Sequence, residues 1–154
     1  MSNDLSAMQT YLHEHIPITA HFGVEVIAFG KGSICLRAPL AANINHRDTA
    51  FGGSLSSLGI LAGWGLIHFS LQQLGLPSRI VIQSSRMEFL APGDADFEAT
   101  AALPDAAGWE RFCTMLRKKG RARITLPSEV TIGSTTVASH EGVYVAILND
   151  RLAG

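Results

Sequence analysis

Residues 49–78 read TAFGGSLSSLGILAGWGLIHFSLQQLGLPS and contain no Asp, Glu, Lys or Arg. The apolar part, residues 58–71, is interrupted by glycine, histidine and serine, and it is shorter than the ~20 apolar residues that a membrane span requires. A helix that is apolar on every side must instead be covered by other parts of the protein. The segment therefore predicts a long buried helix that begins at residues 51–54 and ends near Gly75 and Pro77.

Strand patterns lie on both sides of this helix. The predicted strands are residues 23–29 and 33–38 before the helix, and residues 79–90, 94–103, 121–126 and 142–148 after it. Turn residues predict two hairpins, one across Gly30-Lys31-Gly32 and one across Ala91-Pro92-Gly93. One curved antiparallel sheet wrapped around the apolar helix would cover it on most sides, so the expected class is α+β.

Two other segments have helical or mixed patterns. Residues 2–15 predict a short amphipathic helix on the rim of the core, with Leu5, Met8 and Leu12 on one face and Pro17 as its stop. Residues 109–118 fit a short helix or the beginning of a strand, and their periodicity does not decide between the two. No internal repeat or linker divides the chain, so we expect a single domain over residues 1–154.

Composition limits the classes of partner. The sequence is 47% hydrophobic and 16% charged, which suffices for one sizeable core. With 12 Lys and Arg against 13 Asp and Glu, no general field favours nucleic acid or an anionic membrane. Cys35 and Cys113 lack the spacing of a disulfide framework or a zinc site, and Asp4 stands where an export signal carries basic residues. We expect a cytoplasmic protein with free thiols and with neither a metal nor another cofactor.

The loop before the helix and the helix start carry a family resemblance. The matching residues are Ala38-Pro39-Leu40, Asn43-Ile44-Asn45-His46 and Thr49-Ala50-Phe51-Gly52-Gly53-Ser54-Leu55, with further matches at His15-Ile16-Pro17-Ile18, Gly63-Trp64-Gly65 and Ile80-Val81-Ile82. In these residues the chain resembles the hotdog-fold thioesterase-like domain that proteobacteria carry either alone or fused behind an N-acetyltransferase domain. The resemblance covers nearly the whole chain and corresponds to the stand-alone form. It implies a hotdog fold, a curved antiparallel sheet around one central helix.

The same resemblance implies a reaction and partners. Members of this family are malonyl-acyl-carrier-protein decarboxylases, which make acetyl-acyl carrier protein to prime fatty-acid synthesis. Their functional asparagine on the loop before the helix matches Asn45. The implied partner is the thioester of an acyl carrier protein or of coenzyme A. Hotdog proteins build their sites across the seam of a homodimer, which can pair further into a tetramer, and an exposed sheet edge here would favour such pairing.

The residues themselves favour decarboxylation over hydrolysis. Hydrolysis of a thioester needs a base that activates water, and many hotdog thioesterases carry an acid on the helix at the position that aligns with Ile60. Decarboxylation instead needs stabilisation of negative charge on the thioester oxygen and a poorly solvating pocket. Backbone N–H groups of Gly52 and Gly53, at the positive end of the helix, can supply the first. Apolar side chains such as Phe51 and Ile60 can supply the second.

Each candidate residue also has a structural interpretation. Asn45 can donate a hydrogen bond but cannot act as a base, and it could simply form an Asx-turn. His46 could protonate the enolate carbon or be a polar loop residue. Asp48 could activate a water molecule, or it could supply charge or a cap at the helix start. Gly52 and Gly53 could be required by a close approach of the sheet, and Ser54 could be a polar residue of the first helical turn.

Strand residues of a second subunit are expected to complete the substrate pocket. The candidates are Ser84, Ser85 and Arg86. The basic residues 117–123 fit a solvated edge, although they would also attract an acidic carrier protein or coenzyme A if they lay near the pocket mouth.

Three functions therefore stay open. The first is a decarboxylase that uses Asn45 and the glycine helix start. The second is an acyl thioesterase that uses Asp48 or His46 to activate water. The third is an acyl-thioester binding module without catalysis.

Overall fold

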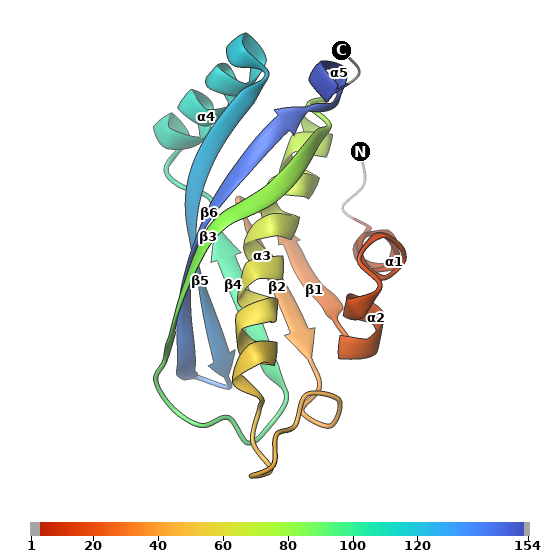
Figure 1. The fold of residues 1–154 in the computed structure, drawn as a ribbon, viewed down its shortest axis with the longest axis vertical. Coiled ribbons are helices and arrows are strands. Elements are labelled where there is room, and N and C mark those ends of the chain that lie inside the picture. Colours follow the sequence, from red (N-terminus) through yellow and green to blue (C-terminus); the bar gives the residue numbers. More distant parts are fainter. Residues whose placement is uncertain (1–3, 153–154) are drawn as a thin grey trace.

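One antiparallel sheet curves around one long helix in the computed structural model, which describes residues 4–152 (Figure 1). The helices are α1 (Leu5–His15), α2 (Ile18–Phe22), α3 (Gly52–Gln73), α4 (Ala106–Lys119) and α5 (Asn149–Leu152). The strands are β1 (Glu25–Gly30), β2 (Ser33–Ala38), β3 (Ser78–Phe89), β4 (Phe97–Ala102), β5 (Arg121–Ile132) and β6 (Thr135–Leu148). Their order in the sheet is β1-β2-β4-β5-β6-β3, and all neighbouring pairs are antiparallel. This architecture confirms the α+β hotdog fold.

The central helix α3 packs against the concave side of the sheet, and glycines let it approach closely (Figure 1). Tyr144 of β6 is fully buried, and its hydroxyl donates a hydrogen bond to the backbone oxygen of Ile60 at 2.9 Å. Burial raises the pKa of Tyr144 well above its usual range, so the hydroxyl remains a donor. By length and composition α3 could cross a membrane, but 67% of its apolar window is buried inside the fold.

We expect Gly63→Ala to lower the free energy of unfolding by about 1–3 kcal/mol, because a Cβ at Gly63 would overlap the Tyr144 hydroxyl. Gly65 on the same helix is a matched control, since its added Cβ would make an ordinary 3.4 Å contact with Ile34. Gly65→Ala should be neutral or stabilising by up to about 1 kcal/mol through helix propensity. Urea denaturation of both variants measures the difference, and equal effects would contradict the tight contact at Gly63.

The predicted hairpin between residues 79–90 and 94–103 is wrong. Both strands exist, as β3 and β4, but β3 is the outermost strand and pairs with β6, whereas β4 lies between β2 and β5. The segment between them passes below the start of α3, where the Ala50 N–H donates to the backbone oxygen of Gly93 at 2.7 Å (Figure 1). The turn residues at 91–93 therefore belong to a crossover from the sheet edge to its middle.

The helices near the two ends differ in detail from the prediction. Helix α1 begins at Leu5 with Asp4 as its N-cap, and positions 2 and 3 of the predicted helix lie outside the described residues. Helix α2 was not predicted: Pro17 ends the first helix but also serves as the N-cap of a second one. The undecided segment 109–118 is helical, as part of α4, which Asp105 caps at its start.

The two C-terminal strands are much longer than their alternating patterns suggested. Strand β5 continues from residue 126 to Ile132, and β6 begins at Thr135 and not at residue 142. Burial alternates from Arg121 to Val130, so that Ser128 and Val130 face α3 while Pro127 faces outward. Pro127 and the polar Ser128 interrupt the hydrophobic pattern but not the strand.

Candidate active site

The loop between β2 and α3 is fixed to the rest of the fold by Asn43. Its buried side chain donates from Nδ2 to the backbone oxygens of Phe22 and Pro39, at 2.9 and 2.8 Å. Its Oδ1 accepts a hydrogen bond from the hydroxyl of Ser54 at 2.9 Å, and its backbone oxygen accepts from the N–H of Phe51 at 2.8 Å. Asn43 therefore sets the position of the loop relative to the first turn of α3.

Asn45 organises the tip of the same loop. Its Oδ1 accepts hydrogen bonds from the N–H groups of Arg47 and Thr49, at 2.8 and 3.1 Å, which is the Asx-turn geometry. Its Nδ2 donates to Thr49 Oγ1 at 2.9 Å. An amide nitrogen carries two N–H groups, and the second one has no protein acceptor among residues 4–152. The Asn45 oxygen thus holds the loop while one N–H stays available.

The start of α3 presents two further donors. Phe51 is the N-cap residue, and its side chain forms no capping hydrogen bond. The N–H groups of Ser54 and Leu55 donate to the backbone oxygen of Phe51, at 2.9 and 3.1 Å. Those of Gly52 and Gly53 have no acceptor within the described part of the chain. Two free donors at the positive end of a long helix favour an oxygen atom that carries negative charge.

Two shallow hollows of about 380 Å³ each flank these donors. The residues of the first include Asn45, Thr49, Gly52, Leu55 and Phe89, and those of the second include Ile18, Phe22, Asn43, Phe51, Gly53 and Ser54. The Phe89 ring lies beside Gly52, since a Cβ there would be 3.3 Å from it, and the Phe51 ring lies over Gly53. Both rings are 56% exposed, so each hollow has an apolar wall next to a backbone donor.

The structure places the other loop candidates apart from these donors. His46 and Asp48 are exposed at the loop tip, and neither lines the two hollows. Asp48 has a left-handed backbone (φ 63°), and it does not cap α3, because Phe51 is the N-cap. Ile60 is half-buried on α3, about two helical turns beyond Gly52.

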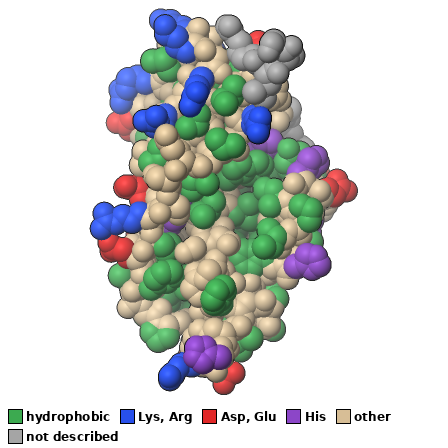
Figure 2. Space-filling view, in the orientation of Figure 1, with side chains coloured by type: hydrophobic (Ala, Val, Ile, Leu, Met, Phe, Trp, Pro, Cys, Tyr) green, Lys and Arg blue, Asp and Glu red, His purple; other side chains and the backbone are tan. Residues whose placement is uncertain are grey.

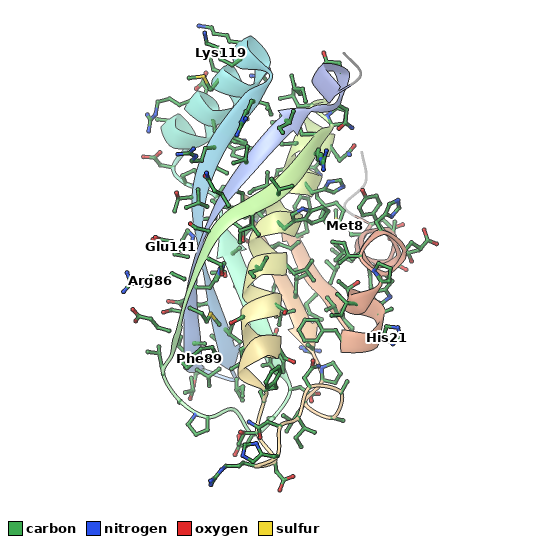
Figure 3. The ribbon with its side chains drawn as sticks, in the orientation of Figure 1. Met8, His21, Arg86, Phe89, Lys119 and Glu141 are labelled. Carbon is green, nitrogen blue, oxygen red and sulfur yellow. The ribbon has the colours of Figure 1, made fainter. Side chains whose placement is uncertain are left out.

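The three strand candidates point to opposite faces of the sheet. Pairing with β6 sets Ser85 opposite Gly142, on the side that faces α3, and sets Ser84 and Arg86 on the outer side. Figure 3 shows Arg86 and Glu141 projecting away from α3. Arg86 also pairs with Glu88 at 3.1 Å. Within one chain, therefore, only Ser85 of the three faces the helix.

The basic residues 117–123 lie far from the Asn45 loop of the same chain. They end α4 and begin β5, and Lys119 lies at the opposite end of the molecule from the start of α3 (Figure 3). Figure 2 shows Lys and Arg side chains gathered toward that end and hydrophobic side chains across the face over α3. The run does not border the site formed by its own subunit.

Sequence reasoning missed several residues of the site. Thr49 and Phe89 line the hollow beside Asn45, but Phe89 reaches it only because β3 runs back along α3 to the helix start. His140 and Ser128 were also missed: both are polar, buried and directed at α3. Their signal in the sequence is a polar residue at an inward position of each alternating strand.

Residues 5–148 match the model of a protein family described as "Putative thioesterase (yiiD_Cterm)". The family match thus covers nearly all of the chain, including the Asn45 loop and α3.

Solved structures of similar proteins share the fold. A protein of unknown function from Chlorobaculum tepidum TLS is 26% identical with a TM-score of 0.87, and the match covers 94% of each chain. A protein from Shewanella oneidensis described as a "putative thioesterase" is 27% identical with a TM-score of 0.81, over 93% of this chain and 96% of that one. A Pseudomonas aeruginosa protein described as a "Probable Thioesterase" is 23% identical with a TM-score of 0.83, over 97% and 99% of the two chains, and shows likeness of fold.

Proposed function

This chain belongs to the family described as "Putative thioesterase (yiiD_Cterm)", a hotdog family that acts on acyl thioesters, and on that premise we propose that it decarboxylates malonyl-acyl carrier protein to acetyl-acyl carrier protein. The reaction breaks the bond between the α-carbon and the carboxylate. Its electron pair passes to the thioester enolate, carbon dioxide leaves, and the α-carbon takes a proton from solvent. The product primes fatty-acid synthesis.

The observation that carries the proposal is the pair of free N–H groups at Gly52 and Gly53. Negative charge develops on the thioester oxygen as carbon dioxide leaves, and donors already fixed in place stabilise such charge without reorganisation. The dipole of α3, a helix of 22 residues, points its positive end at the same place. Decarboxylation requires this stabilisation and no general base.

Among residues 4–152 no carboxylate lines either hollow, which supports the same choice; the imidazole of His21 lines the hollow that contains Gly53 but is exposed to solvent. Position 60, two turns into α3, holds isoleucine, and the carboxylate nearest in sequence to the helix start, Asp48, is exposed and lines neither hollow. Asn45 lines the hollow that contains Gly52, and the second N–H of its amide has no acceptor among residues 4–152. It is suited to hold the thioester carbonyl or the departing carboxylate.

We also propose that the protein works as a homodimer in the cytoplasm. Strand β3 is an outer strand of twelve residues, and one side of its backbone pairs with no strand among residues 4–152. Val81, Phe89 and Leu90 are exposed along and just beyond it. A long edge strand with exposed apolar side chains pairs readily with another strand, and a second copy would supply one. Sedimentation of wild type against Val81→Glu tests this: we expect a dimer that the substitution weakens, and a monomeric wild type would contradict it.

The activity is tested with a panel of substrates. Purified protein is incubated with malonyl-carrier protein, malonyl-coenzyme A, acetyl-coenzyme A and longer acyl-coenzyme A thioesters, and carbon dioxide and free thiol are both measured. We expect carbon dioxide from the malonyl substrates alone, and we expect it to appear from them before free thiol does. Free thiol from the malonyl substrates without carbon dioxide would overturn the proposal, and no product from any substrate would favour a binding module.

A further inference from the structure

A row of hydrogen bonds crosses the interior between the sheet and α3. Ser85 Oγ lies 2.8 Å from His140 Nε2, His140 Nδ1 lies 3.2 Å from Ser128 Oγ, and the Ser128 hydroxyl donates to the backbone oxygen of Gly59 at 3.0 Å. His140 and Ser128 are each 3% exposed, whereas Ser85, on the outermost strand, is exposed. The row therefore begins at the surface with a hydroxyl and ends on the backbone of the central helix.

The partners fix which nitrogen of His140 carries the proton. Because the Ser128 hydroxyl gives its proton to Gly59, its oxygen can only accept from His140, so Nδ1 is the protonated nitrogen. Nε2 then has a free lone pair directed at the hydroxyl of Ser85. Burial lowers the pKa of His140, which keeps the ring neutral and able to accept a proton. Glu141, which raises that pKa slightly, projects to the other face of the sheet (Figure 3).

This arrangement contains the three parts of an activated nucleophile. A hydroxyl lies within hydrogen-bond reach of a base, and a third group holds the base in one tautomer. The Ser85–His140 pair lies at a different position along α3 from the N–H donors of Gly52 and Gly53. His140 lies against Gly59, at 3.1 Å from a Cβ built there, which is about 10 Å along α3 from Gly52.

We propose that Ser85 is a nucleophile, activated by His140, at a second reacting position that hydrolyses acyl thioesters. Ser85 Oγ attacks the thioester carbonyl carbon while its proton passes to His140 Nε2. The carbon–sulfur bond breaks, and the leaving thiolate takes that proton. Water then attacks the Ser85 ester with His140 again as base, which releases the free acid and restores the serine. The proposal rests on the thioester substrate class but not on decarboxylation.

The test uses the full-length protein and two probes, a fluorophosphonate and acetyl-coenzyme A. We expect a fluorophosphonate adduct on the peptide that contains Ser85, and thiol release from acetyl-coenzyme A. Both should be lost at least tenfold in Ser85→Ala and in His140→Gln. Ser139→Ala, beside His140 but on the outer face of β6, should behave as wild type. Near-UV circular dichroism of each variant shows whether it is folded.

Two outcomes would overturn the proposal. One is a folded wild type that forms no adduct at Ser85. The other is a Ser85→Ala variant that releases thiol as fast as wild type, which would show that the Ser85 hydroxyl is not the nucleophile. If His140→Gln does not fold, the comparison of Ser85→Ala with Ser139→Ala still shows whether Ser85 is required for the adduct and for thiol release. Acetyl-coenzyme A has no carboxylate to lose, so this readout is separate from decarboxylation of malonyl-carrier protein.

Discussion

Replacing Asn45 with aspartate should lower the rate of malonyl-carrier-protein decarboxylation by roughly 10²–10³-fold, which is the usual effect of losing one donor to a developing oxyanion. The aspartate oxygen can still accept from the N–H groups of Arg47 and Thr49, so the loop keeps its shape. The amide N–H groups are lost, and the new charge repels the malonyl carboxylate. Initial rates at saturating substrate, with the melting temperature of each variant, measure the effect.

Two further variants distinguish the role of Asn45 as a hydrogen-bond donor to the substrate from its role in holding the loop. Asn45→Ala removes both functions and should be at least as slow as Asn45→Asp. Thr49→Val removes the hydroxyl that Asn45 contacts at 2.9 Å but keeps the amide, and its rate should stay within about tenfold of wild type. If Asn45→Asp retained nearly full activity, the amide would serve only to shape the loop.

Mild acid should destabilise the protein because of His68. Burial, with a smaller effect of His15, lowers the pKa of His68 from 6.5 to about 4. Its ring is only 6% exposed and stacks between Tyr11 and Trp64, with ring centroids 4.7 and 4.8 Å away. Proton uptake would place a charge inside this buried stack, which joins Tyr11 of α1 to α3.

The direction of the effect follows from proton binding. Between pH 6.5 and 4 the unfolded chain binds a proton at this residue and the folded protein does not, so stability falls as pH falls through that range. The full shift corresponds to about 3 kcal/mol, complete only below pH 4. We expect urea unfolding from pH 7 to pH 4.5 to show most of this loss.

A phenylalanine variant isolates the contribution of His68. His68→Phe keeps an aromatic ring between Tyr11 and Trp64 but cannot bind a proton, so the pH dependence should become shallower. Part of the slope should remain, because burial also lowers the pKa of His140. If the free energy of unfolding depended equally on pH in wild type and in His68→Phe, protonation of His68 would not be coupled to folding.

The fold was largely predictable because its signals are local. The uncharged segment at residues 49–78 specified α3, and Lys31 and Gly32, both with positive φ, mark the turn between β1 and β2. Strand order was not predictable from such signals. Ala91-Pro92-Gly93 has the composition of a hairpin turn, yet it crosses under α3, and only the tertiary packing of β3 against β6 decides between these outcomes.

The site was predictable in part for the same reason. Asn45, Gly52 and Gly53 lie close in sequence, and local loop and helix geometry bring their donors to one end of α3. Phe89 joins them, and Ser85 meets His140, only through the pairing register of β3 with β6. No pattern within either strand specifies that register, so these contacts could not be read from the sequence.

The most direct test of the proposed reaction is the intact mass of the carrier protein after incubation with the purified enzyme. We predict that malonyl-carrier protein first loses the mass of one carbon dioxide and keeps its thioester, so that acetyl-carrier protein appears before any carrier protein with a free thiol. Carrier protein with a free phosphopantetheine thiol, together with malonate in solution, would show hydrolysis and contradict the account.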